Sequence, residues 1–372
     1  MNTNKTGGIG KLVAFFAIAV AMLFAFGLVA DGWQLFDPNE PDSGEDATEG
    51  NETDENTDGN QEPEIPEEPE VYIPEYTDPL TGLETTEESA RYRPIAFVMN
   101  PQAPLYGISG ADILAEIPVE GGETRLLAIT SGKKKLGKIG SLAATRDYIS
   151  NISKFFGAVI VSAGDDDKIE YSGCDVTSSS FDLSKQSGYS YTEYTHFHYT
   201  NDDLILAGLT NSGISTMNNA AISLPYRFLP FDAESPIIGT ESARCATLQY
   251  SESSSTELYF SDDDGRYTLS KGGVIKKDML NDKPLKFDNV FILFADTVTY
   301  ENADGSSMIM NTVGGGVGYY LTGGTLTKIS WESTLSGSMT FHTEDGQPLT
   351  VNRGTSYIGI KKSSKIADVK IS

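Results

Sequence analysis

The stretch ADILAEIPVEGGETRLLAIT, residues 111–130, decides how the folded part of the chain is built. Its two halves, residues 111–119 and 124–130, are apolar runs, and Gly121-Gly122 lies between them. Short apolar runs on either side of a glycine pair are typical of two strands joined by a tight turn. The sequence therefore predicts a β-hairpin here, with further strands and helices around it.

Strand and helix patterns alternate along the flanking sequence. Residues 93–100, RPIAFVMN, and residues 158–161 are expected to be strands. Residues 143–156 have helical spacing, with one apolar side formed by Tyr148, Ile149, Ile152, Phe155 and Phe156. Asn201 can cap a further helix that runs to about Thr210. We therefore expect an α+β protein whose first domain, residues 79–236, is mixed α/β.

The remaining sequence, residues 237–372, has a different pattern. Short aromatic and β-branched runs, such as NVFILFADTVTY (289–300) and GGVGYYLTGGTLTKISW (315–331), are separated by Asp, Gly and Asn. Closely spaced strand signals joined by turn signals are typical of an antiparallel sheet, a sandwich or a small barrel. The second domain is therefore expected to be mainly antiparallel β.

The N-terminal segment, residues 1–30, has the pattern of a membrane anchor. Residues 12–30 form an uncharged apolar run behind Lys5 and Lys11, roughly 28 Å long as a helix, which is close to the thickness of a bilayer core. A cleaved secretory signal is the alternative, but its apolar region is usually shorter. Because basic flanking residues resist translocation, we expect a single pass through the cell membrane, with the N-terminus cytoplasmic and the later domains extracellular.

Residues 31–78 are acidic throughout and contain prolines, so they predict a disordered tether. The net charge of the chain is −26; the first 30 residues contribute +2 and residues 31–78 contribute −18, which leaves −10 for residues 79–372. Such an acidic protein is a poor partner for nucleic acid or anionic lipid.

A bacterial lipoprotein carries its lipid on a cysteine at the end of its signal. The two cysteines of this chain are Cys174 and Cys245, far from the N-terminal apolar run, so lipid attachment is excluded. Outside the cell the two thiols could pair as a disulfide. The alternative is two unrelated, buried cysteines. No cofactor or metal site is predicted, since two isolated cysteines and three histidines give no ligand pattern.

Several motifs resemble those of a known family, the YerB-like family of Gram-positive bacteria. They are DPLTGL (78–83), RPIAFVMN (93–100), ADILAEIPVEGGETRLLAI (111–129), IGSLAATR (139–146) and DGQPLTVNRGTSYIGI (345–360). The family consists of two domains of unknown function and has no established reaction. The resemblance implies a two-domain protein held at the outer face of the membrane.

The resemblance also points to four polar positions: Glu120, Arg125, Arg146 and His196. Glu120 and Arg125 flank one turn, and Arg146 would lie near a helix start, where backbone donors of Gly140 and Ser141 could assist. Such a cluster suits a carboxylate or phosphate. The alternative is a structural ion-pair network that holds the hairpin to the helix.

Three departures from the family pattern bear on catalysis. Family members often have Arg at the position of Ala143, His at the position of Ser162 and Asn at the position of Phe197. The loss of these polar groups favours binding over turnover.

Two classes of function remain open. The first is a membrane-anchored extracytoplasmic binding or scaffold protein that engages a wall polymer, peptide or envelope protein. The absence of three polar side chains that family members often have favours this class. The second is a cell-envelope hydrolase or transferase with Glu120 as acid or base, His196 assisting and the arginines holding an anion.

Overall fold

The described part of the chain consists mostly of β-strands, with three short α-helices: α1 (Glu87–Ala90), α2 (Asp147–Phe155) and α3 (Asp202–Asn211). The computed structural model describes residues 74–164, 179–193, 197–217, 231, 239–302, 305–334 and 339–372. The predicted anchor at 12–30 and the tether up to residue 73 lie outside these ranges. Within the ranges, no helix combines the length and the apolar character needed to cross a bilayer.

A 14-stranded sheet forms the centre of the fold. Its main path runs β20 (Met339–Thr343), β19 (Thr325–Ser333), β18 (Gly314–Thr322), β15 (Asn289–Ala295), β21 (Ser356–Lys362), β2 (Ile113–Pro118), β3 (Thr124–Thr130), β1 (Ile95–Met99), β4 (Lys138–Leu142), β8 (Phe197–Asn201) and β7 (Tyr191–Glu193). Beside this path, β5 (Val159–Ser162) pairs with β1 and with β6 (Ser179–Asp182), and β9 (Glu241–Ser242) pairs with β19.

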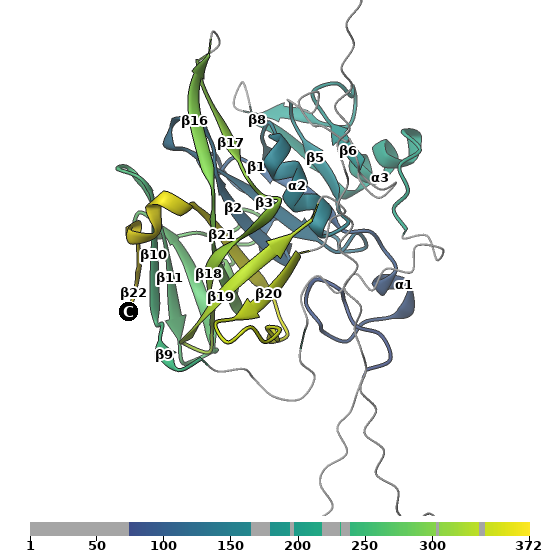
Figure 1. The fold of residues 1–372 in the computed structure, drawn as a ribbon. Helices are drawn as coiled ribbons and strands as arrows, with labels where there is room; N and C mark the ends of the chain where they lie inside the picture. Colours follow the sequence, from purple (N-terminus) through teal and green to yellow (C-terminus); the bar gives the residue numbers. More distant parts are fainter. Residues whose placement is uncertain are drawn as a thin grey trace, which may run out of the picture. The chain divides into compact units, whose positions relative to one another are not determined.

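Two smaller sheets complete the strands. The six-stranded sheet contains β13 (Val274–Ile275), β12 (Arg266–Lys271), β11 (Ser254–Ser261), β10 (Cys245–Ser251) and β22 (Val369–Ile371), with β14 (Lys286–Phe287) paired to β12. The strands β16 (Thr297–Asn302) and β17 (Gly305–Met310) pair with each other and extend away from the large sheet (Figure 1).

The hairpin predicted at residues 111–130 is confirmed. β2 and β3 are antiparallel, with Ile113 opposite Ile129 and Pro118 opposite Thr124. Between them, Gly121 and Gly122 have φ angles of 74° and 78°, a left-handed conformation that only glycine adopts readily. The glycine pair therefore sets where the two strands turn.

The strands on both sides of residue 236 belong to one sheet. β2 pairs in parallel with β21, which in turn pairs in parallel with β15. The other pairs formed by β9–β22 are antiparallel, so the expected antiparallel character of residues 237–372 is confirmed apart from β21. The expected α/β character of residues 79–236 is correct only in part, because strands outnumber helices there.

Both faces of the large sheet are buried, which explains why β1, β2 and β15 have no exposed side chain. One face packs against α2 through Ile149 and Ile152. The other face packs against α3 and the six-stranded sheet, whose Leu248 and Leu258 are fully buried. A strand covered on both faces tends to be apolar along its length, which is the pattern of β1, IAFVM.

The predicted helix at 143–156 is shorter than expected and begins at Asp147. The chain before it is extended, since Ala143 N–H donates to Val98 O and Thr145 N–H donates to Gly164 O. These bonds to β1 and to the segment after β5 keep this stretch out of the helix. The predicted cap of α3 is confirmed: Asn201 Oδ1 accepts a 2.9 Å hydrogen bond from Leu204 N–H.

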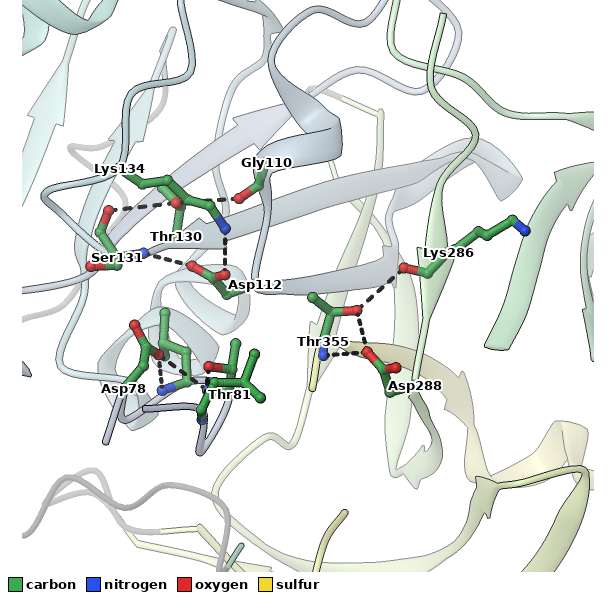
Figure 2. Close-up of polar contacts among 12 residues, drawn as sticks. Asp78, Thr81, Gly110, Asp112, Thr130, Ser131, Lys134, Lys286, Asp288 and Thr355 are labelled. Atoms are coloured by element: carbon green, nitrogen blue, oxygen red, sulfur yellow. Dashed lines mark hydrogen bonds and ion pairs between the residues drawn. The ribbon is translucent and has the colours of Figure 1, made fainter. Parts of the chain in front are cut away.

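A polar turn at Asp78 joins the start of the described chain to the start of β21. Asp78 Oδ1 accepts hydrogen bonds from Leu80 N–H and Thr81 N–H, at 2.8 and 3.1 Å (Figure 2). Thr81 O in turn accepts from Gly354 N–H at 2.8 Å. Residues 74–78, assigned to the tether from the sequence, are thus in the fold, and the motifs DPLTGL and RGTS meet.

Asp112 is the second carboxylate of this junction. Its Oδ1 is 2.6 Å from Lys134 Nζ, and its Oδ2 accepts from Ser131 N–H at 2.9 Å (Figure 2). Its backbone O accepts from Ser356 N–H at 2.9 Å, next to the parallel pairing of β2 and β21. Burial and then repulsion from Asp112 raise the pKa of Asp78, so the charged form of Asp78 is disfavoured in the folded state.

This junction gives a stability prediction. A raised folded pKa means that ionised Asp78 destabilises the fold at neutral pH, and that this penalty disappears as the pH falls below the unfolded value of about 3.9. We therefore expect Asp78→Asn, which keeps both acceptor contacts, to raise the melting temperature at pH 7 but not at pH 3. Asp78→Ala also loses both hydrogen bonds, each contributing about 0.5–1.5 kcal/mol, and should melt below Asp78→Asn at either pH. Equal melting of the two variants would contradict this.

Candidate functional site

The structure brings together three of the four predicted site residues. Glu120 begins the short 3₁₀ turn η2 (Glu120–Gly122) between β2 and β3, and Arg125 is the second residue of β3. Arg146 directly precedes α2. The turn and the helix start meet through an ion pair, with Arg146 Nε 3.1 Å from Glu120 Oε2. Both side chains are about one-fifth to one-quarter exposed, at 19% and 24%.

Arg125 adds a second guanidinium to this cluster. Among the described residues, its side chain donates one hydrogen bond, from Nη1 to Thr124 O at 3.1 Å, and forms no ion pair. Burial lowers the pKa of Arg125, repulsion from Arg146 lowers it further, and the carboxylates of Glu123 and Glu120 oppose the shift. Two like charges held together and half-buried favour an anionic partner.

Tyr148, in the first turn of α2, interacts electrostatically with the charges of the cluster. It is 1% exposed, and its hydroxyl has no hydrogen-bond partner in the described part of the chain. Burial and the charge of Glu120 raise the pKa of Tyr148, so the phenol stays protonated. The sequence pattern placed Tyr148 on the apolar side of the helix and gave no signal for a role of its hydroxyl group.

The other three residues predicted for the site, His196, Gly140 and Ser141, are not shown to join this cluster. His196 lies outside the described residues, so its part in the cluster stays a prediction. Gly140 and Ser141 lie in β4 rather than at the helix start, and their N–H groups donate to Tyr106 O and Pro104 O, both at 3.2 Å. The expectation that these donors serve the site is therefore wrong.

Cys245 is the first residue of β10 and is half-buried. Cys174 lies outside the described residues, and the pairing stays a prediction. Within the described ranges, no three His, Cys, Asp or Glu side chains gather in a way that could hold a metal ion.

A second charged centre, which the sequence reasoning missed, lies at Glu116 in the middle of β2. The Glu116 side chain is fully buried and is ion-paired with Lys271 of β12. The carboxylate accepts hydrogen bonds from three hydroxyls: Thr124 Oγ1 at 2.8 Å, Thr256 Oγ1 at 2.7 Å and Tyr357 Oη at 2.8 Å. A single charge inside an apolar run was the available signal.

Glu116 links the two main sheets, because Lys271 and Thr256 belong to the six-stranded sheet and Tyr357 to β21. Burial opposes ionisation of Glu116. The charge of Lys271 and the hydrogen bonds from Lys271, Thr256 and Tyr357 outweigh burial and hold the pKa of Glu116 below its ordinary value. Because its hydrogen bonds and its charge are satisfied by groups of the protein, the Glu116 carboxylate holds the two sheets together.

Comparison with known proteins agrees with the motifs. Residues 80–215 match the N-terminal domain, and residues 246–358 the C-terminal domain, of the protein family of unknown function DUF3048. The chain is 29% identical over 293 residues to "Putative lipoprotein YerB" of Bacillus subtilis (strain 168), covering 76% of this chain and 85% of that protein.

The fold is also that of a solved relative. The crystal structure of the YerB protein from Bacillus subtilis superimposes with a TM-score of 0.66 and 23% identity, over 80% of this chain and 99% of the other. The match to the N-terminal domain contains Glu120, Arg125, Arg146 and Glu116. The chain therefore belongs to the DUF3048 family of YerB-like proteins.

Proposed function

We propose that this protein is a membrane-anchored, extracytoplasmic binding or scaffold protein of the Gram-positive cell envelope. In this proposal, Glu120, Arg125 and Arg146 bind an anionic group of a wall polymer, peptide or envelope protein, with His196 as a further contact. The observation that carries it is Arg125, a half-buried guanidinium that forms no ion pair among the described residues and lies beside the like charge of Arg146.

Binding accounts for the cluster better than catalysis does. A general acid or base must reach the reacting group of a substrate. The Glu120 carboxylate is instead engaged by Arg146, which fixes its position. At the departures from the family pattern, Ala143 and Ser162 are both buried and bring no charge. The alternative, a hydrolase or transferase using Glu120 and His196, would release products from the wall.

The location outside the membrane rests on the relative and on residues 12–30. The Bacillus subtilis relative is named as a putative lipoprotein. Stable lipid anchoring requires an attachment site, and the cysteines of this chain are at 174 and 245, far from the apolar run. We propose that residues 12–30 anchor this member by spanning the bilayer, where a lipoprotein would use lipid.

The test uses the full chain in neutral detergent micelles, mixed with sedimentable wall fragments. One wall sample retains its anionic polymers, and a second is stripped of them by acid. The proposal predicts that the protein sediments with the intact wall, binds the stripped wall less, and releases no soluble fragment detectable by mass spectrometry. Soluble fragments would favour the hydrolase, and equal sedimentation without wall would contradict binding.

A further inference from the structure

We propose that the protein has a second anion-binding site, a lysine-lined cavity that takes phosphate groups. The cavity has a volume of about 500 Å³ and lies where the ends of β10, β21 and β22 meet the 3₁₀ segment η4 (Ser363–Asp368). Its charged lining residues are four lysines and two carboxylates: Lys361, Lys362, Lys365, Lys370, Glu252 and Asp368. The cavity shares no lining residue with the cluster of Glu120, Arg125 and Arg146, and it goes beyond the proposed function.

Lys361 makes the cavity more than a patch of surface charge. It is 3% exposed, and its ammonium group donates to Gln249 O and lies 4.8 Å from the centre of the Tyr250 ring. Within the described chain, no carboxylate lies within ion-pair distance of it. A buried ammonium has three donors and is costly to leave without a counter-charge. An anion in the cavity would supply that charge.

The other lysines leave positive charge at the mouth of the cavity. Lys365 pairs with Asp368 at 3.4 Å, but both side chains are well exposed, so the pair is weak. Lys362 Nζ donates to the hydroxyl of Thr299 at 3.2 Å. Lys370 is exposed on β22. Set against the carboxylates of Glu252 and Asp368, the four ammonium groups leave the lining with a net charge of 4 − 2 = +2. This charge matches a doubly charged phosphate group, and lysine acts as a point charge suited to phosphate.

The cavity lies beside the turn between β2 and β3. Pro118, at the end of β2, lines it, and Ser251 of the lining lies so close to Gly122 that an added Cβ there would be 2.9 Å from the Ser251 Cβ. The cavity therefore adjoins the turn that carries Glu120. Because the whole chain has a net charge of −26, this local basic site favours short phosphate groups over nucleic acid.

Phosphate could come from a wall polymer or from a lipid headgroup, and two probes separate them. The first is a soluble glycerol-phosphate oligomer added to the full chain in nanodiscs of phosphatidylcholine. The second is the same chain in nanodiscs that contain phosphatidylglycerol, without oligomer. In each, the reaction rates of individual lysines with an acylating reagent are measured by mass spectrometry. We expect Lys365 and Lys370 to be protected by at least one probe, while Lys277, which lies elsewhere and pairs with Asp282, is not.

Variants give the affinity test. Lys365→Gln with Lys370→Gln removes two exposed charges and is expected to weaken oligomer binding about tenfold or more. Asp368→Asn should strengthen it, and Lys277→Gln should leave it unchanged. Protection of the cavity lysines no greater than that of Lys277 under both probes would overturn the proposal. So would a double variant that binds as the wild type does. Arg125 is intact in all these variants, so their outcome is independent of the Glu120 cluster.

Discussion

Replacing Glu116 by glutamine is expected to lower the free energy of unfolding by about 3–5 kcal/mol. The change keeps the shape of the side chain and leaves the Lys271 ammonium, whose side chain is 9% exposed, without its counter-charge. Breaking a buried ion pair on one side costs far more than the pair contributes in net stability. Chemical denaturation of the full chain in detergent micelles, followed by near-ultraviolet circular dichroism, measures the loss.

The matched control removes both charges. Glu116→Gln combined with Lys271→Met leaves no uncompensated charge between the sheets, so it should recover most of the lost stability. If the double variant is as unstable as Glu116→Gln alone, the loss does not come from the buried ammonium and the account of this centre is wrong.

The Glu116 centre also predicts the pH dependence of stability. A folded pKa held below the unfolded value of about 4.3 stabilises the protein above that value. The contribution is lost as the pH falls through the folded pKa. Between pH 5 and pH 3 the wild type should therefore lose more stability than the Glu116→Gln, Lys271→Met double variant. Parallel melting curves against pH for the two proteins would contradict this.

Replacing Arg125 by glutamine is expected to weaken binding to wall that retains its anionic polymers by about 10- to 100-fold. A charge-assisted hydrogen bond to a charged group contributes about 1.5–3 kcal/mol, which corresponds to that range. Folding should be little affected, because the Arg125 side chain donates to its neighbour's carbonyl and forms no ion pair in the described chain. Sedimentation of the full-length variant with wall fragments measures the change.

Arg91→Gln is the matched control for that prediction. Arg91 is exposed, follows α1 and pairs with Glu87 at 3.5 Å, so its loss removes the same charge elsewhere. Binding of Arg91→Gln should equal that of the wild type. Equal loss in both variants would mean that net charge alone, rather than the cluster, determines binding.

Local patterns predicted the elements well. The Gly121-Gly122 pair located the hairpin, and Asn201 located the start of α3, because a turn and a cap depend on residues close in the chain. The sequence did not reveal that β2 pairs with β21, some 240 residues away. The apolar pattern of a buried strand does not indicate which other strand it pairs with. For the same reason the start of α2 was misplaced: the hydrogen-bond partners of Ala143 and Thr145 lie in β1 and just after β5.

The candidate site was predictable through its family resemblance rather than its spacing. That resemblance pointed to Glu120 and Arg146, which the structure joins in an ion pair. Tyr148 was missed because an aromatic residue on an apolar helix face looks like core. Lys361 was missed because the residues that line its cavity are distant in the sequence and come together only in the folded protein.

We propose above all that the cluster of Glu120, Arg125 and Arg146 contacts the cell wall outside the membrane. The most direct test places a photoreactive amino acid at Glu123, which is exposed and adjoins the cluster, in the full-length protein of intact cells. After illumination and wall digestion, the account predicts a protein adduct carrying a wall fragment, and none with the same probe at Lys277. An adduct to cytoplasmic components, or no wall adduct at Glu123, would contradict it.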